Sequence, residues 1–163
     1  MIADLGVSLR PVQPGDEEFL YQVYASTRAD EMALVDWTAE QKEAFLRMQI
    51  GAQTEHYKIH YPNAKYQILE GAGVPIGRLI VERSKEFILI IDIALLPEYR
   101  KAGIGTAVIR DLMDEATRVS LPIVLRVEFF NPAIKLYSRL GFLKTREMGV
   151  YHEMVWRPSA NNS

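Results

Sequence analysis

The chain contains no cysteine, which excludes disulfides, a thiolate nucleophile and thiolate metal ligands. It has only three histidines, and they do not form the His-Glu-x-x-His pattern of a zinc enzyme. His56 and His60 are four residues apart and could share a helix face. A metal ion held there would still need a further ligand. The sequence therefore predicts no metal site.

Long hydrophobic runs and an excess of basic charge are also absent. The longest apolar stretches have the length of a strand, far short of the roughly 20 residues that a membrane helix needs. The net charge is −2, so no global basic field favours nucleic acid or an anionic membrane. The first residues lack the basic and apolar regions of a signal peptide. We therefore expect a cytoplasmic protein that binds neither nucleic acid nor membrane.

The remaining composition is that of an ordinary globular protein. Hydrophobic residues make up 48% of the chain and charged residues 25%. A chain of 163 residues can bury one sizeable core. We expect a single domain over residues 1–157 and a disordered tail at 158–163.

Apolar periodicity and turn residues predict the element order β-αα-βββ-α-β-α-ββ. Thr38 and Gln41 have the spacing of a capping box, so they mark the start of the second helix. We expect the apolar side of this helix to comprise Phe45, Leu46, Met48 and Ile50. Phe87 to Leu95 is nearly continuously apolar, as expected for a strand covered on both faces.

The most informative segment runs from Ile91 to Thr106. An apolar strand ends at Pro97, and a helix begins through Gly103 and Gly105. The first amides of a helix lack intrahelical acceptors and lie at its positive end, so they form a site for an anion such as a pyrophosphate. The two glycines would let this anion approach the backbone closely. The spacing fits neither a P-loop nor a dinucleotide fingerprint.

A second informative segment runs from Asn131 to Phe142. Asn131 is a suitable helix N-cap, and Pro132 suits the first helical position. Gly141 is a suitable residue to end the helix. The apolar face between them is formed by Ala133, Leu136, Tyr137 and Leu140. The segment therefore predicts a short helix that leads into a strand.

The two segments together resemble the motifs of the GNAT family of N-acetyltransferases. Arg100-x-x-Gly103-x-Gly105 after a strand is similar to the acetyl-coenzyme A loop of that family, Arg/Gln-x-x-Gly-x-Gly/Ala. The segment 131–142 is similar to its C-terminal signature, Asn…Ala-x-x-Leu-Tyr-x-x-x-Gly-Phe. The element order resembles the family fold over essentially the whole chain. This resemblance implies an α/β fold, with a mixed, mostly antiparallel sheet of about six to seven strands flanked by four helices.

The resemblance also implies how acetyl-CoA would be held. In the family the strand before the glycine loop splays from its neighbour, and its free backbone groups pair with pantetheine like an added strand. In this chain those groups would belong to Ile93, Ala94 and Leu95. The pyrophosphate would be held by the backbone of Lys101, Ala102, Gly103, Ile104, Gly105 and Thr106. Arg100 would either brace the turn or reach the phosphate.

The implied chemistry is direct attack of a neutral primary amine on the acetyl thioester. Tyr137 matches the family tyrosine that protonates the departing thiolate. Asn131 matches the family asparagine that contacts the cofactor near the pantetheine. It precedes Ala133 by two positions rather than the usual three, so its side chain can point elsewhere.

The general base departs from the family pattern. Leu89 and Arg126 stand where relatives have glutamate, and neither can act as a base. Asp92, inside an apolar strand, is our candidate, because a desolvated carboxyl group takes up a proton more readily. Strict alternation would place Asp92 on the face of Ile90. A purely structural role for Asp92 remains open, and Glu128 is the next candidate.

The acceptor is an unidentified amine of a small molecule or a peptide. We expect its pocket to be lined by Asp30, Glu31, Asp36 and Trp37, a composition that suits a cation. Two other functions stay open: a non-catalytic domain that binds and senses acetyl-CoA, and a structural domain in which the glycines only form a turn. A homodimer is compatible with the sequence.

Overall fold

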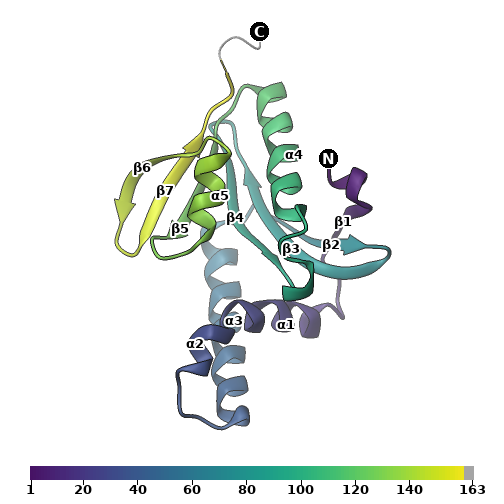
Figure 1. The fold of residues 1–163 in the computed structure, drawn as a ribbon, viewed down its shortest axis with the longest axis vertical. Helices are drawn as coiled ribbons and strands as arrows, with labels where there is room; N and C mark the ends of the chain where they lie inside the picture. The colour runs from purple at the N-terminus through teal and green to yellow at the C-terminus, as the bar shows by residue number, and fades with distance from the viewer. Residues whose placement is uncertain (160–163) are drawn as a thin grey trace.

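A seven-stranded mixed sheet organises the computed structural model, which describes residues 1–159 (Figure 1). The strands are β1 Val7–Pro11, β2 Lys65–Gly71, β3 Val74–Arg83, β4 Ile88–Leu95, β5 Ile123–Glu128, β6 Leu143–Met148 and β7 Tyr151–Trp156. They lie in the order β1-β2-β3-β4-β5-β7-β6, and only β4 and β5 are parallel. The expected α/β fold with a mostly antiparallel sheet is confirmed. Most of the expected disordered tail lies outside the described residues.

The four expected helices are present, together with a short additional one. The helices are α1 Glu17–Thr27, α2 Ala29–Ala33, α3 Ala39–His60, α4 Ile104–Val119 and α5 Ala133–Arg139, with 3-10 turns at Ile2–Leu5 and Pro97–Tyr99. The additional helix is α2, whose single turn is too short to show a helical period. The predicted capping box is present, since the Gln41 amide donates to the Thr38 hydroxyl at 3.1 Å and the Thr38 amide donates to the Gln41 side chain at 2.9 Å.

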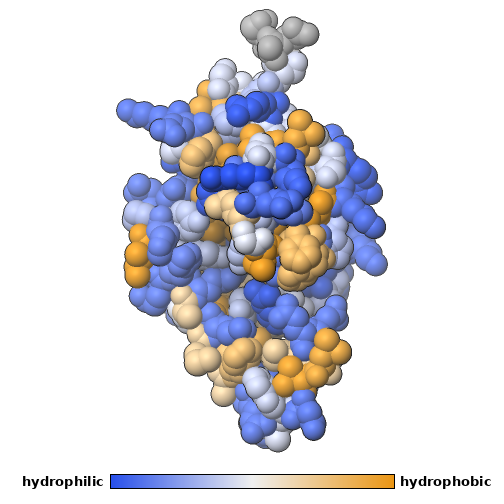
Figure 2. Space-filling view, turned by 90° about the vertical axis from the view of Figure 1, so that its left-hand side faces the viewer, coloured by the Kyte–Doolittle hydropathy of each residue, from blue (hydrophilic) through white to orange (hydrophobic). Residues whose placement is uncertain are grey.

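The first half of α3 projects beyond the sheet, together with α2 (Figure 1). Leu46 is buried as expected, but Met48 is 64% exposed, so its assignment to a buried face is wrong. The reason is that α3 packs on the body of the molecule along only part of its length. Apolar side chains therefore remain at the surface of this end, among charged ones (Figure 2).

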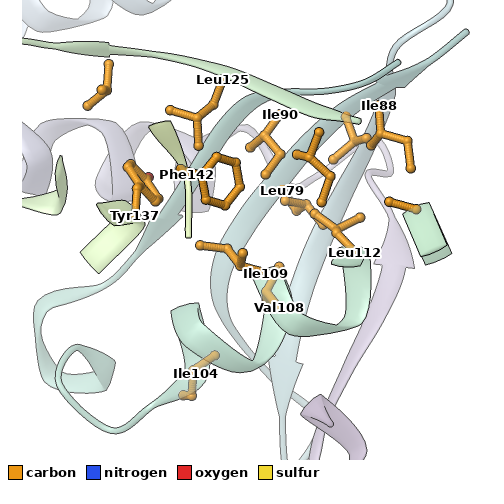
Figure 3. Packing of buried hydrophobic residues seen from close by; sticks show 14 of the residues in the cluster. Leu79, Ile88, Ile90, Ile104, Val108, Ile109, Leu112, Leu125, Tyr137 and Phe142 are labelled. Carbon is orange, nitrogen blue, oxygen red and sulfur yellow. The ribbon is translucent and has the colours of Figure 1, made fainter. Parts of the chain in front are cut away.

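The main core lies between the sheet and the helices α4 and α5. Strand residues such as Leu79, Ile88 and Ile90 belong to the same buried cluster as the apolar stripe of α4 and the Tyr137–Phe142 pair (Figure 3). The stripe of α4 consists of Ile104, Val108, Ile109, Leu112 and Ala116. The apolar spacing that predicted this helix is thus explained by packing against one face of the sheet.

A β-bulge in β4 changes which side chains share a face. Ile80 pairs with Asp92 and Val81 pairs with Ile90, which leaves Ile91 as an extra residue. Cross-strand partners point to the same face, and consecutive residues point to opposite faces. Asp92 and Ile90 therefore lie on opposite faces, and the placement expected from strict alternation is wrong. Ile90 belongs to the α4 side, whereas Asp92 points to the side of α3.

The parallel strands β4 and β5 pair over only three residues each. Ile88 to Ile90 face Ile123 to Leu125, and no further pair follows. The rest of β4 stays paired with β3, and the rest of β5 stays paired with β7. The two strands therefore diverge beyond Ile90, and the sheet opens at the end that leads to the glycine loop.

Gly77 of β3 allows the diverging end of β4 to approach closely. A Cβ atom at this position would lie 2.4 Å from the Ala94 carbonyl oxygen and 2.8 Å from the Leu95 side chain. We predict that Gly77→Ala lowers the free energy of unfolding by about 1–3 kcal/mol, the usual effect of overpacking. Urea denaturation measures this change.

The matched control is Gly51→Ala in α3, where a Cβ atom would meet nothing within 4 Å. There the change should raise stability by about 0.5–1 kcal/mol, because alanine favours the helix. If both variants have the same stability, β3 does not constrain the end of β4.

Candidate active site

Three hollows meet where β4 and β5 diverge. The splay cavity, of about 180 Å³, lies between the two strands and is lined by Asp92, Glu128 and Tyr137. The acidic cleft, of about 420 Å³, extends from it toward α2. The tyrosine groove, of about 290 Å³, extends toward the end of α3 and is lined by Tyr57, Tyr61 and Tyr151. Gln53 of α3 lines all three, so they form one continuous trough.

Backbone groups of β4 face the splay cavity at two of the three expected positions. The Leu96 amide donates to Ile76 of β3 at 2.9 Å, so the backbone of Leu96 and, by alternation, of Ala94 turns toward β3. The backbone of Ile93 and Leu95 consequently turns away from β3, into the gap. The structure thus offers an unpaired strand edge at the point where the sequence motif predicted one.

Arg100 braces the turn that follows β4. Its Nε donates to the Leu95 carbonyl oxygen at 3.0 Å, and its Nη2 donates to the Ser26 hydroxyl of α1 at 3.1 Å. Of the two roles that the sequence left open, the structure displays the bracing one. The Leu95 carbonyl oxygen is therefore occupied, while the Leu95 amide still faces the gap.

The glycine loop presents bare amides at the start of α4. Gly103 occupies the N-cap position with φ of 83°, and no side chain caps the helix. A Cβ atom at Gly103 or Gly105 would meet nothing within 4 Å. The first turn contains no acidic residue. These amides therefore face open space at the positive end of a 16-residue helix, as an anion site requires.

The other residues of the loop differ in their exposure. Lys101 adopts a left-handed conformation with φ of 63°. Lys101 and Ala102 are exposed, and Thr106 is half-buried. Ile104 is buried in the core, so only its backbone could meet a ligand.

Tyr137 of α5 reaches the splay cavity from the side of the core. Its ring packs against Phe142, with 5.9 Å between the ring centroids (Figure 3). Burial first, and then the negative charge of Asp92, raises the pKa of Tyr137 to about 12. No described residue forms a hydrogen bond with its hydroxyl. The phenol is therefore protonated at neutral pH and free to donate a hydrogen bond into the cavity.

Asp92 lies on the opposite side of the cavity and is held by a buried arginine. Nε of Arg78 donates to the Asp92 carboxylate at 2.5 Å, and its Nη2 donates to the Gln53 side chain at 2.8 Å. Arg78 is only 7% exposed. Arg78 was not predicted from the sequence. Its charge in the middle of an apolar strand, next in the chain to the strand that contains Asp92, was the available signal.

Asn131 lies at the junction of the acidic cleft and the splay cavity. Its side-chain oxygen accepts a hydrogen bond from the Ala133 amide at 2.8 Å. Asn131 thus caps the first amide of α5 as predicted, although the helix begins at Ala133 and Pro132 precedes it rather than being its first residue. The cap occupies this oxygen. Only the side-chain nitrogen remains to contact a ligand.

The acidic cleft contains part of the acidic and aromatic set expected around the acceptor. Asp30 and Glu31 of α2 line it, but Asp36 and Trp37 do not. Trp37 instead packs edge-on against Phe45, with 5.2 Å between the rings. Residues 34–38 connect α2 to α3, and they turn Trp37 toward α3.

The tyrosine groove was not predicted from the sequence. Gln53 and Tyr57 lie four residues apart on one face of α3, and Tyr61, four residues further on, is the C-cap that follows the helix. Burial, and then the charge of Asp92, also raises the pKa of Tyr57. The four-residue spacing was the available signal, but it did not show which face of the helix met the sheet.

Residues 1–159 contain neither a cluster of metal ligands nor a helix that could span a membrane. No group of three histidine and carboxylate residues is placed to hold a metal ion in this part of the chain. Among the described helices, none has the length and apolarity to cross a bilayer.

Comparison with known proteins identifies the family. Residues 22–142 match the Acetyltransferase (GNAT) family. An N-alpha-acetyltransferase of Sulfurisphaera tokodaii is 36% identical over 66 residues, which are 39% of this chain and 40% of that relative. The chain therefore belongs to the GNAT acetyltransferase family, whose members use acetyl-CoA as the acetyl donor.

Solved structures show the same fold at low sequence identity. PaiA N-acetyltransferase of Thermoplasma acidophilum, in complex with coenzyme A, matches with a TM-score of 0.69 and 16% identity, covering 93% of this chain and 98% of that one. Spermidine N-acetyltransferase of Vibrio cholerae, in complex with CoA and spermine, matches with a TM-score of 0.62 and 19% identity, covering 94% and 96%.

Proposed function

We propose that this protein transfers an acetyl group from acetyl-CoA to a primary amine of a small molecule or a peptide by direct attack. The supporting observation is the gap between β4 and β5, which has Tyr137 on one side and the carboxylates of Asp92 and Glu128 on the other. A thioester laid along β4 would place its carbonyl group between an acid and two proton acceptors. A non-catalytic acetyl-CoA sensor would not need this arrangement.

In the proposed complex, acetyl-CoA lies along the open edge of β4. The amides of Ile93 and Leu95 donate to the pantetheine in the manner of an added strand. The backbone groups of Ala94 face β3, so Ala94 lies beside the pantetheine without a hydrogen bond to it. The pyrophosphate binds the amides from Lys101 to Thr106. The Asn131 side-chain nitrogen contacts the cofactor beside α5.

The acceptor enters from the other face of the sheet, where the acidic cleft and the tyrosine groove open. Its neutral amine attacks the thioester carbonyl carbon and forms a tetrahedral intermediate. When the carbon–sulfur bond breaks, the Tyr137 hydroxyl protonates the thiolate. The products are the N-acetylated acceptor and free coenzyme A.

Asp92 is the proposed acceptor of the amine proton, directly or through a water molecule. The ion pair with Arg78 fixes the position of the Asp92 carboxylate at the cavity. Glu128 lies on β5 across the same cavity and is the next candidate.

The acceptor class has support from two sides. The acidic residues of the cleft suit a cationic amine, and a spermidine N-acetyltransferase shares the fold. The relative with the highest identity reported above is named for acetylation of α-amino groups, which favours a peptide N-terminus. Release of thiol from acetyl-CoA in a screen of polyamines, amino acids and peptides tests the function, and binding of acetyl-CoA without transfer to any of them would favour a sensor.

The glycine loop can be tested by blocking the approach of the pyrophosphate. Gly105→Trp should abolish acetyl-CoA binding, because the side chain would fill the open space over the helix start. Calorimetry measures the affinity. Gly51→Trp in α3 is the control, since that glycine is also helical and open. Normal affinity in folded Gly105→Trp would place the pyrophosphate elsewhere.

Tyr137→Phe should lower kcat by roughly 10²–10⁴, the usual effect of losing a general acid, with little change in acetyl-CoA affinity. Because the pKa of Tyr137 is about 12, its proton is retained below that value. The ratio of wild-type to mutant turnover should therefore be constant from about pH 7 to 10. Tyr66→Phe, which changes a hydroxyl on β2, is the control. A normal kcat in Tyr137→Phe would show that Tyr137 serves only in packing.

Asp92→Asn should cut kcat and flatten the acidic limb of the pH–rate profile, while acetyl-CoA affinity is kept. Glu128→Gln is the comparison on the facing strand: if Glu128 is the base instead, this variant rather than Asp92→Asn flattens the acidic limb. A loss of thermal stability with an unchanged profile shape would instead show that Asp92 is structural. Stopped-assay profiles and thermal unfolding of both variants distinguish these outcomes.

A further inference from the structure

The tyrosine groove contains a cation that the proposed reaction does not use. Arg126 of β5 lines the groove at its junction with the splay cavity. Its Nη1 donates to the Tyr61 hydroxyl at 3.3 Å. Its Nε is buried and has no hydrogen-bond partner among the described residues. A guanidinium has five N–H donors, so most of those of Arg126 are unused by the protein.

Glu153 does not satisfy these donors. It is the cross-strand partner of Arg126 on β7, but its carboxylate lies 3.7 Å from Arg126 Nε, beyond hydrogen-bond distance. The Glu153 carboxylate is engaged by the Arg146 guanidinium at 3.1 Å and the Thr145 hydroxyl at 2.9 Å. Glu153 therefore reduces the charge around Arg126 without occupying its hydrogen-bonding edge.

The carboxylates of the trough lie toward one end. No carboxylate lines the tyrosine groove, where Arg126 is the charged residue. The acidic cleft is lined by the acids Asp30, Glu31, Asp92 and Glu128, together with Arg28 and Arg78, which pair with Glu31 and Asp92. An acceptor whose amine lies in the splay cavity would thus extend either toward carboxylates or toward a guanidinium. A partly buried arginine beside tyrosines is suited to an anionic group, since its fork of donors matches a carboxylate or a phosphate.

We propose that the tyrosine groove is a binding subsite for an anionic group of the acceptor, a carboxylate or a phosphate, and that Arg126 selects acceptors that carry this group. The role of Arg126 in selecting acceptors rests on the proposed acetyl transfer. Arg126 donates to the anion, and Tyr61 both accepts from Arg126 and donates to the anion. The rings of Tyr57 and Tyr151 flank the carbon skeleton between anion and amine.

Binding can be tested without turnover. The probes are benzoate, phenyl phosphate and the neutral benzamide, titrated into protein saturated with coenzyme A so that the pyrophosphate site is filled. We expect at least one anion to bind about tenfold or more tightly than benzamide. Arg126→Gln should weaken that anion by about 10- to 100-fold, the usual range for a lost hydrogen bond to a charged group. The preferred anion distinguishes a carboxylate from a phosphate.

Two further variants make this result specific. Arg126→Lys keeps the charge and should retain part of the preference for the anion. Arg83→Gln removes a cation that pairs with Glu115 on α4, away from the groove, and should change nothing. Equal affinity of benzoate, phenyl phosphate and benzamide for the wild-type protein overturns the inference, as does anion binding that is insensitive to Arg126→Gln.

Turnover separates this inference from the proposed function. For the carboxylate case the matched acceptors are 4-(aminomethyl)benzoate and 4-(aminomethyl)benzamide, and for the phosphate case 4-(aminomethyl)phenyl phosphate replaces the benzoate. The acceptor with the preferred anion should have the higher kcat/KM through a lower KM, and Arg126→Gln should bring the ratio close to one. Equal transfer to charged and neutral amines refutes the subsite but leaves acetyl transfer standing. Arg126-dependent anion binding with no transfer to any amine refutes acetyl transfer instead.

Discussion

The site depends on the early end of the pairing between β4 and β5. Parallel strands usually bury their backbone groups against each other, but here only three pairs form before the strands diverge. The bulge at Ile91 directly follows the last pair, and the close approach of β3 at Gly77 lies further on, at the end of β4. Bulges bend the strand that contains them. The open edge is therefore built into the sheet rather than left by a missing segment.

The buried ion pair between Arg78 and Asp92 connects this opening to α3. Desolvating two charges is costly, and apolar residues of similar size often stabilise a protein as well as a buried pair does. The pair gains a third partner in Gln53, so it connects β3, β4 and the helix that covers them. The effect of this ion pair on the site is to hold groups in position. It keeps a carboxylate at the cavity and holds α3 where Gln53 and Tyr57 line the trough.

The opening joins the two faces of the sheet. Tyr137 belongs to the core between the sheet and α5, whereas Asp92, Arg126 and Glu128 point to the face of α3. Without the gap these groups would be separated by a continuous layer of strands. The same gap connects the acidic cleft to the tyrosine groove. A cofactor from one face and an acceptor from the other could thus meet at one carbonyl carbon.

The local features of this protein were readable from its sequence. The Thr38 capping box, the start of α4 at Gly103 and the helix before Gly141 were predicted because each depends on a few neighbouring residues. The family motifs lie on two of these segments. Tyr137 could be named for the same reason, since its position follows from the helix that contains it.

Tertiary structure decided what these local features face. The bulge at Ile91 moved Asp92 to the side of α3, and no periodicity in β4 reveals an extra residue. Arg78 became the partner of Asp92 through strand pairing, and Arg126 met Tyr61 across 65 positions of the chain. Hydrogen bonds inside a helix or a turn are set by residues a few positions apart, so the sequence by itself determined them. Contacts between distant strands and helices depend on register and packing, which exist only once the whole sheet has formed.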